Sequence, residues 1–118
     1  MLFAHGSRDP EWAQPFSVIA KRLAENFEVR LAYLEAMRPS LDEAIASLVA
    51  GGASSVRVVP VFLGSGGHVK RDLPRLVATA KSAHPDIDIA LENPIGEEPA
   101  VLEAIAAAIV RTLARRDS

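Results

Sequence analysis

Four short apolar stretches recur along the chain, and each is followed by a segment whose apolar residues return every three or four positions. The stretches lie at residues 1–4, 29–34, 55–63 and 87–91, and they have the length and composition of buried strands. A strand followed by a helix, four times over, predicts a parallel sheet with right-handed crossovers and helices on both faces. We therefore expect an α/β fold, a three-layer sandwich with a four-stranded parallel sheet in the flavodoxin-like strand order 2-1-3-4.

Two of the helices carry clear start or stop signals. Ser40 and Glu43 have the spacing of a capping box, and the glycine pair at 51–52 ends the same helix. The first helix is expected to begin near Gln14, or to follow a distorted turn, because Pro15 lacks the amide that a helix interior needs.

Helical spacing also predicts which faces are buried. In the first helix the inward positions are Trp12, Phe16, Ile19, Ala20, Leu23 and Phe27. In the last helix, which Pro99 opens, they are Leu102, Ile105, Ala106, Ile109 and Leu113. The third helix is expected over 73–83, with Asp72 as its N-cap and Pro74 in its first turn. Pro60 cannot donate a ladder hydrogen bond, so it should mark a strand end, an irregularity or an edge.

Composition narrows the class of protein. A chain of 118 residues can build one hydrophobic core, and we expect a single domain over 1–118. The formal net charge of −2 argues against nucleic acid as the main partner, because a binding domain usually carries a basic excess. Cysteine is absent, which excludes disulfides, thiolate metal sites and iron–sulfur clusters. Without a signal peptide or an apolar run of about 18 residues, the protein is expected in the cytoplasm and not in a membrane.

Two histidines and a glutamate follow three of the predicted strands. His5 follows the first strand, Glu35 the second and His68 the third, where His68 ends a glycine-rich loop that starts at residue 64. In the expected strand order the switch point lies between strands one and three, and ligands bind there outside the carboxyl ends of the strands. His5 and His68 are therefore expected to share one crevice, with Glu35 on the same edge of the sheet.

These side chains could bind a metal ion or accept a proton. Two neutral imidazoles and a carboxylate are natural ligands for cobalt, iron, nickel or zinc, and the same groups accept protons near neutral pH. The glycine loop allows a bulky ligand to approach the backbone, while its amides, the next helix N-terminus, Arg8, Lys70 and Arg71 suit anionic groups. Plainer interpretations stand beside these. An isolated loop histidine is more often solvated than a ligand, Glu35 could be an ordinary loop carboxylate, and the basic residues could all be solvated.

Several nucleotide- and phosphate-binding motifs do not fit. Residues 64–70 lack the G-x-x-x-x-G-K-[ST] spacing of a Walker A loop, and Val69 stands where G-x-G-x-x-G requires its third glycine. A phosphohistidine phosphatase usually has arginine directly before its His-Gly, whereas Ala4 precedes His5 here. A flavin-binding domain stays open on topology, although the loops offer few hydroxyls for a phosphate and few aromatics to stack a flavin.

Three ordered motifs carry a family resemblance. They are Ala4-His5-Gly6-Ser7-Arg8-Asp9-Pro10, Tyr33-Leu34-Glu35 followed by Pro39-Ser40-Leu41, and Val59-Pro60-Val61-Phe62-Leu63-Gly64-Ser65-Gly66-Gly67-His68-Val69. Together they resemble the sirohydrochlorin chelatases, and among these the small single-domain cobaltochelatases related to the siroheme ferrochelatases. The resemblance covers nearly the whole chain and ends around Ala108. The family usually has several more apolar residues before its first His-Gly than the four found here.

The resemblance implies a lyase that inserts a divalent metal into sirohydrochlorin without ATP, for cobalamin or siroheme biosynthesis, with cobalt favoured and iron next. It implies that His5 and His68 bind the metal and that Glu35 assists deprotonation or metal delivery. It also implies a chelatase form of the flavodoxin-like fold, a homodimer, and no cofactor beyond the substrate metal. We expect the carboxylate-rich substrate to contact Ser7, Arg8, Gly64, Ser65, Gly66 and Gly67. A metal or tetrapyrrole carrier without turnover is the main alternative, and a phosphoryl-transfer or nucleotide-binding domain is a weaker one.

Overall fold

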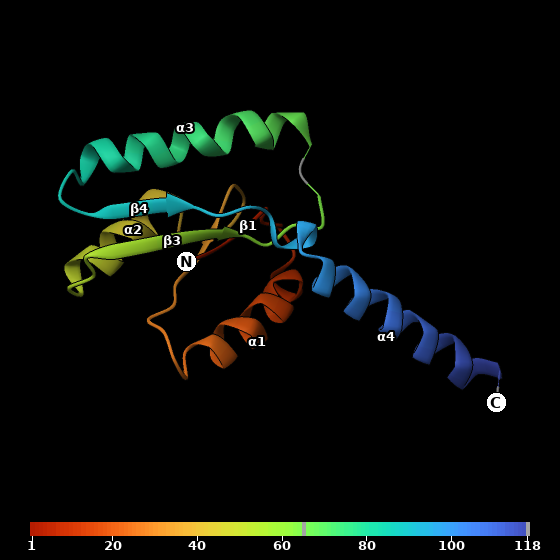
Figure 1. The fold of residues 1–118 in the computed structure, drawn as a ribbon. Helices are drawn as coiled ribbons and strands as arrows, with labels where there is room; N and C mark the ends of the chain where they lie inside the picture. Colours follow the sequence, from red (N-terminus) through yellow and green to blue (C-terminus); the bar gives the residue numbers. More distant parts are fainter. Residues whose placement is uncertain (65, 118) are drawn as a thin grey trace.

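The computed structural model describes residues 1–64 and 66–117, apart from the side chains at positions 68, 116 and 117. Strands and helices alternate along the chain, as the apolar pattern predicts, with two short 3₁₀ helices, η1 and η2 (Figure 1). In chain order the elements are β1 (Leu2–Ala4), η1 (Pro10–Ala13), α1 (Gln14–Leu23), β2 (Leu31–Tyr33), α2 (Leu41–Ala50), β3 (Ser55–Pro60), α3 (Gly67–Ala83), β4 (Asp88–Leu91), η2 (Ile95–Glu97) and α4 (Pro99–Asp117).

The four strands form one parallel sheet in the order β2-β1-β3-β4. In its register Phe3 lies beside Ala32 on one side and Pro60 on the other, and Val58 pairs with Leu91 across to β4. Pro60 is the last residue of β3, so it marks a strand end as expected. The predicted fold class and strand order are confirmed.

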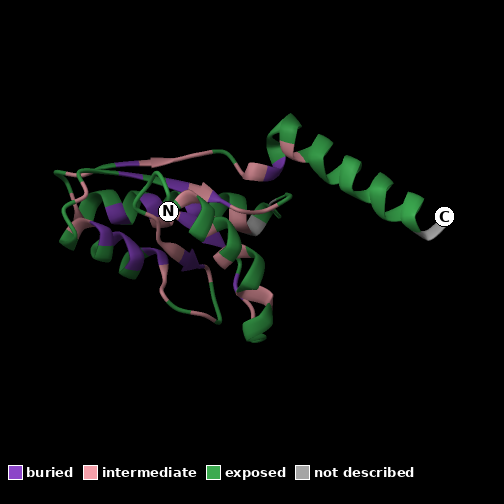
Figure 2. Cartoon of the chain, turned by 90° about the horizontal axis from the view of Figure 1, so that it is seen from below, coloured by how far each residue is buried: buried purple, intermediate pink, exposed green. Residues whose placement is uncertain are grey.

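The hydrophobic core lies between the sheet and the layer formed by α2 and α3. Phe3, Ile45 and Val58 are completely buried there, and Figure 2 shows buried positions running along the strands and α2. The predicted capping box starts α2, with the Ser40 hydroxyl accepting from the Glu43 amide at 3.3 Å and the Glu43 carboxylate accepting from the Ser40 amide at 3.0 Å. Each side chain thereby satisfies an amide that the first turn leaves unpaired.

The opposite face of the sheet carries α1, which packs through aromatic rings near β2. Trp12 lies 4.7 Å from Phe16 and 6.4 Å from Tyr33, measured between ring centroids. The distorted early turn is present as η1, and the regular helix begins at Gln14. The expectation that Ile19 and Phe27 lie inward is wrong, because they are 40% and 68% exposed. The helix ends at Leu23, so Phe27 falls outside its periodicity, and the main contacts of α1, with η1 and β2, leave Ile19 exposed.

The last helix, α4, leaves the carboxyl edge of the sheet and extends away from the body (Figures 1 and 2). Its predicted inward residues are exposed: Leu102 by 51%, Ile105 by 36%, Ile109 by 53%, Leu113 by 58%, and Ala106 is exposed as well. That expectation is wrong, because helical spacing identifies an apolar stripe but not what covers it. The radius of gyration is 15.9 Å, against about 13.5 Å for a compact chain of this length. Even so, neither α4 nor any other helix of the described residues is both long and apolar enough to cross a bilayer.

The third helix begins earlier than the sequence indicates. It starts at Gly67, not near Leu73, with Gly66 as its N-cap and Pro74 in its interior. Asp72 is therefore not the cap, and His68 lies in the first helical turn. The cap has no side chain that could accept an amide hydrogen bond, so the usual sequence signal for a helix start is missing.

Candidate functional site

The loops that follow β1 and β2 meet at the carboxyl edge of the sheet. Backbone pairing continues past the strands, because the Leu34 amide donates to the Ala4 carbonyl at 3.0 Å and the Glu35 amide donates to the His5 carbonyl at 3.1 Å. The two side chains lie side by side, with Nε2 of His5 2.9 Å from Oε1 of Glu35. Both are open to solvent, with 49% and 64% of their side-chain surface exposed. The structure thus brings together these two predicted site residues.

Gly6 is what lets the two loops come so close. It is buried, has a φ of +99°, and a Cβ on it would lie 1.9 Å from the Glu35 carbonyl oxygen. Only glycine meets both demands, since a side chain would clash with backbone and would strain the left-handed conformation. No local sequence pattern predicts this role for Gly6. Its position directly after the site histidine gives only a hint.

The chain turns sharply directly after Glu35. Ala36 has a φ of +64°, and the Met37 amide donates back to the Glu35 carbonyl at 2.8 Å. This hydrogen bond spans two residues, as in a γ-turn, and a non-glycine residue rarely adopts this conformation. Such local strain is found preferentially beside functional sites, where the surrounding structure enforces it.

The third predicted ligand belongs to the neighbouring strand. His68 is the second residue of α3, which follows β3, and β3 pairs directly with β1. Its side chain lies outside the described residues, as does Ser65, so the shared crevice stays a prediction for both. Around them, a Cβ placed on Gly64, Gly66 or Gly67 would meet no atom within 4 Å. Packing within the chain does not require these glycines, and the space above them is open to a ligand.

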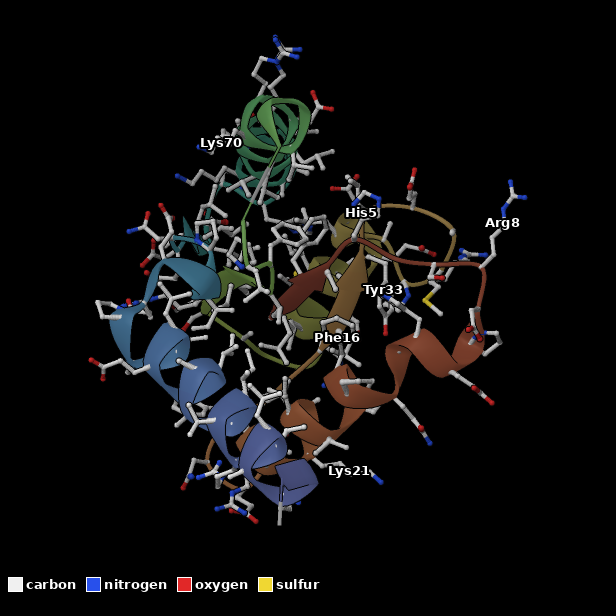
Figure 3. All side chains as sticks on the ribbon, turned by 90° about the vertical axis from the view of Figure 1, so that its right-hand side faces the viewer. His5, Arg8, Phe16, Lys21, Tyr33 and Lys70 are labelled. Atoms are coloured by element: carbon white, nitrogen blue, oxygen red, sulfur yellow. The ribbon has the colours of Figure 1, made fainter. Side chains whose placement is uncertain are left out.

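Ser7 and Arg8 lie in the loop after β1. The Ser7 hydroxyl oxygen accepts a hydrogen bond from the Asp9 amide at 3.1 Å, so it helps to shape the turn before η1. Figure 3 shows the Arg8 side chain directed away from His5, with Lys70 of α3 on the other side of His5. The two cations therefore lie on either side of His5 in this view.

A small cleft opens beside the site, between the start of α3 and the loop after β4. Its volume is about 190 Å³, and Lys70, Leu73 and Asn93 are among the residues that line it. This is below the roughly 300–1,000 Å³ usual for ligand pockets, and His5 and Glu35 are not among its lining residues. His5 and Glu35 lie outside the cleft, on an exposed edge formed by the loops at the carboxyl end of the sheet, which we call the rim. Asn93 is an additional polar group there that the sequence analysis did not single out.

On the β3 side of the rim, a backbone contact joins the loop after β4 to the loop after β3. Gly96 of η2 donates its amide to the Phe62 carbonyl at 2.9 Å, and a Cβ on Gly96 would lie 2.2 Å from the Leu63 carbonyl oxygen. The loop after β4 therefore rests directly on the loop after β3. As at Gly6, the absence of a side chain lets two site loops touch.

The described side chains give the site limited coordinating power on their own. Among them, no group of three or more histidines, cysteines, aspartates or glutamates lies close enough together to hold a metal ion. An imidazole beside a carboxylate can still bind a cation through two donors or take up a proton. At the end of β2, burial raises the pKa of the Tyr33 hydroxyl, which makes it a still weaker acid.

Comparison with known protein families shows which family the chain belongs to. The CbiX family model matches residues 1–112. The chain belongs to the CbiX family. A sirohydrochlorin cobaltochelatase from Saccharolobus islandicus is 32% identical over 95% of this chain and 93% of its own length. A cobaltochelatase of the same name from Priestia megaterium is also 32% identical, over 89% of this chain and 35% of its own.

Solved structures agree with this membership. A CbiX protein from Marinobacter aquaeolei VT8 is 33% identical, with a TM-score of 0.88 over 99% of this chain and 95% of its own. The sirohydrochlorin chelatase SirB from Bacillus subtilis subspecies spizizenii, in complex with cobalt, is 26% identical, with a TM-score of 0.79 over 93% of this chain and 48% of its own. The resemblance seen in the motifs is confirmed, and this CbiX protein is a chelatase, an enzyme of the lyase class.

Proposed function

We propose that the chain inserts a divalent metal into sirohydrochlorin without ATP, with cobalt preferred and iron next, in cobalamin or siroheme biosynthesis in the cytoplasm. The His5–Glu35 contact carries the proposal, because it puts a metal ligand and a proton acceptor side by side on the ligand-binding edge of the sheet. The relatives named as sirohydrochlorin cobaltochelatases support the substrate. The SirB structures with cobalt and with Fe³⁺ support both metals.

The chemistry of insertion explains the choice of residues. A metal entering a tetrapyrrole must lose bound water, and the macrocycle must lose two pyrrole N–H protons. When Nε2 of His5 carries its proton, it donates to the Glu35 carboxylate and leaves Nδ1 with a lone pair for the metal. Glu35 then fixes the imidazole tautomer and is also placed to accept a proton from the macrocycle. In this proposal His5 is the metal ligand and Glu35 is the base.

A second imidazole would complete the delivery site. We assign this role to His68, since its helix follows the strand that pairs with β1. Two imidazoles leave coordination positions open, so the ion can pass to the macrocycle; a closed set of four ligands would release it slowly. No further cofactor is part of the proposal, because the metal is itself a substrate.

The carboxylates of the macrocycle need donors around the rim. We propose Arg8 and Ser7 on the β1 side, and on the β3 side the backbone of Gly64, Ser65, Gly66 and Gly67. Open space above Gly64, Gly66 and Gly67 supports the second group, because a flat ring can approach the backbone there. Lys70 and the N-terminus of α3 would add positive potential on the same side.

We further propose that residues 1–118 act as one domain and that the chain works as a homodimer. The support is the open site, where 49% of the His5 side chain and 64% of the Glu35 side chain are exposed, together with the exposed apolar stripe of α4. A contiguous apolar surface on a chelatase chain of this size suits a protein–protein contact.

A carrier that holds metal or tetrapyrrole without turnover would use the same ligands. The experiment that separates it from the enzyme mixes purified protein with an excess of sirohydrochlorin and Co²⁺ in the absence of ATP. We expect the absorbance of many equivalents of sirohydrochlorin to change at a rate proportional to protein. Conversion of at most one equivalent would instead identify a carrier. Repeating the measurement with Fe²⁺ under anaerobic conditions tests the metal preference.

A further inference from the structure

One large apolar side chain is exposed among the loops of the site. Most of the large hydrophobic residues that the structure describes as exposed lie on α4, and Val18, Ile19 and Phe27 lie on α1 or just after it. Leu63 is the exception among them, because it lies in the loop after β3 and is 66% exposed. The glycine-bearing stretch begins directly after it, at Gly64. The rim therefore presents an apolar group to solvent beside glycines.

Leu63 lies at the same edge of the sheet as the proposed metal ligand His5. The pairing of β3 with β1 continues past the paired strand residues, where the Val61 amide donates to the Phe3 carbonyl at 2.8 Å. Leu63 follows Val61 by two residues, and His5 follows Phe3 by two residues. Two adjacent strands thus place an apolar side chain and an imidazole at their carboxyl ends.

The backbone of Leu63 is held in place although its side chain is exposed. Figure 1 shows η2 beside the loop that leads from β3 to α3. The Gly96 amide of η2 donates to the Phe62 carbonyl at 2.9 Å, and a Cβ on Gly96 would stand 2.4 Å from the Leu63 Cα. Phe62 also packs edge-on against the buried ring of Phe3, with the ring centroids 6.2 Å apart. A fixed stretch of backbone therefore presents the Leu63 side chain to solvent.

The surface beside Leu63 has room for a flat ligand. A Cβ on Gly64, Gly66 or Gly67 would meet no atom within 4 Å, so the space over these residues is open. A flat ring could lie over the glycines and cover the leucine, which would remove apolar surface of both from water. A hydrated metal ion or a lone carboxylate would gain nothing from such a contact, because each is strongly solvated.

We propose that Leu63 is a substrate-binding residue that contacts one face of the tetrapyrrole ring and helps to hold the ring over the rim. The inference rests on the proposed function and extends its substrate site, whose other members are polar groups directed at the carboxylates. Those groups hold the edge of the ring. A contact on its face adds affinity that depends on buried apolar area and not on charge.

The test is a titration of metal-free sirohydrochlorin, followed by its absorbance, because ring binding requires no metal transfer. Leu63→Ala should raise the dissociation constant about tenfold, since it removes most of the apolar contact. Leu63→Met keeps an apolar side chain of similar size and should stay within about threefold, whereas the polar Leu63→Asn should bind as weakly as Leu63→Ala. Val18→Ala is the matched control, because Val18 is 68% exposed but lies on α1, and should leave the constant within about twofold.

Ionic strength separates a face contact from a contact with carboxylates. The tenfold ratio between Leu63→Ala and the unsubstituted protein should persist from low to high salt, because a contact between apolar groups is not screened. Arg8→Ala should instead weaken binding by a ratio that shrinks as salt rises. If the ratio for Leu63→Ala also shrinks toward one, Leu63 acts through nearby charges and the proposal is overturned.

Turnover gives an independent readout. A contact made equally in the ground state and the transition state raises KM when it is lost and leaves kcat unchanged. Leu63→Ala should therefore raise KM for sirohydrochlorin about tenfold, with kcat for Co²⁺ insertion within about threefold of the unsubstituted protein. A large fall in kcat with an unchanged KM would contradict a binding role.

The remaining outcomes separate this inference from the function on which it rests. If the unsubstituted protein binds sirohydrochlorin and Leu63→Ala binds it equally tightly, the ring does not contact Leu63 and only this inference fails. If the unsubstituted protein does not bind sirohydrochlorin, the proposed function fails and the inference fails with it. If Leu63→Ala weakens self-association in sedimentation equilibrium as much as it weakens ring binding, Leu63 belongs to a contact between chains, which also overturns the proposal.

Discussion

Nε2 of His5 lies 2.9 Å from Oε1 of Glu35, although 30 residues separate them in the chain. The contact follows from the sheet, because β1 and β2 are adjacent and parallel and their backbone pairing continues past the strands as far as His5 and Glu35. Neither side chain belongs to the core, so each can be changed with little risk to the fold. The pair is therefore a direct test of the proposed chemistry.

His5→Ala should lower the rate of metal insertion at least about 100-fold, because it removes a proposed metal ligand and the partner of the carboxylate. The measurement is the absorbance change of sirohydrochlorin with Co²⁺. Circular dichroism and thermal melting should match the unsubstituted protein, since the His5 side chain is half exposed. His84→Ala is the matched control: it removes a histidine that follows α3, at the opposite end of that helix from the site, and should keep the full rate.

Glu35→Gln should slow insertion about 10- to 100-fold while changing sirohydrochlorin binding much less. The amide oxygen can still accept a hydrogen bond from the His5 ring, but it cannot take up a pyrrole proton near neutral pH. Binding is measured by titrating the metal-free macrocycle, and insertion by stopped-flow absorbance. Glu28→Gln, which alters a carboxylate paired with Arg30 outside the site, serves as the control. An unchanged rate for Glu35→Gln would remove Glu35 from the mechanism.

Gly6→Ala should lower the free energy of unfolding by about 2 kcal/mol or more, since a methyl group would be forced against backbone in a left-handed conformation. A Cβ at this position would stand 1.9 Å from the Glu35 carbonyl oxygen. Urea denaturation checks the value. Gly51→Ala is the matched control, because its Cβ would meet neighbours only at 3.5 Å and its φ is −81°. Similar losses for both variants would contradict the steric explanation.

The lowered pKa of Glu43 predicts that the stability of the protein depends on pH. A hydrogen bond from the Arg38 guanidinium, aided by the Ser40 amide, lowers the pKa of the Glu43 carboxyl from 4.5 to about 2. The folded state then binds fewer protons than the unfolded state between these values, so the stabilisation is complete above pH 4.5 and is lost as pH falls toward 2. Glu43→Gln keeps an acceptor for the capping box but does not titrate.

The difference in unfolding free energy between the unsubstituted protein and Glu43→Gln should therefore shrink as pH is lowered through that window. Guanidinium denaturation at a series of pH values measures it. A difference that stays constant from neutral to acidic pH would show that the Arg38–Glu43 pair does not stabilise the fold.

The sequence alone predicts the strand order of the sheet and the proximity of two candidate site residues, His5 and Glu35. Strand order follows from the alternation of apolar runs and amphipathic segments, and adjacency of β1 and β2 then places His5 beside Glu35. The capping box of Ser40 and Glu43 could also be predicted from the sequence, because the two residues are close together in the chain. These predictions depend on periodicity or short-range spacing.

The errors have a different origin. The start of α3 was missed because Gly66 caps the helix without a side chain, and Pro74 is tolerated in the interior. The direction of α4 was missed because the spacing of Leu102 and Ile109 shows that a face is apolar without showing what it packs against. The role of Gly6 depends on a contact with a loop about 30 residues away, which no local pattern records.

The close backbone contact between Gly96 and Leu63 connects the start of α4 to the loop after β3. The same turn that rests on the glycine-bearing loop also starts α4, so a helix held by a second copy would steady that loop. Specific activity should then fall as the enzyme is diluted below the dissociation constant of the proposed dimer and recover on concentration. A specific activity independent of concentration across that range would show that the rim of each chain works alone.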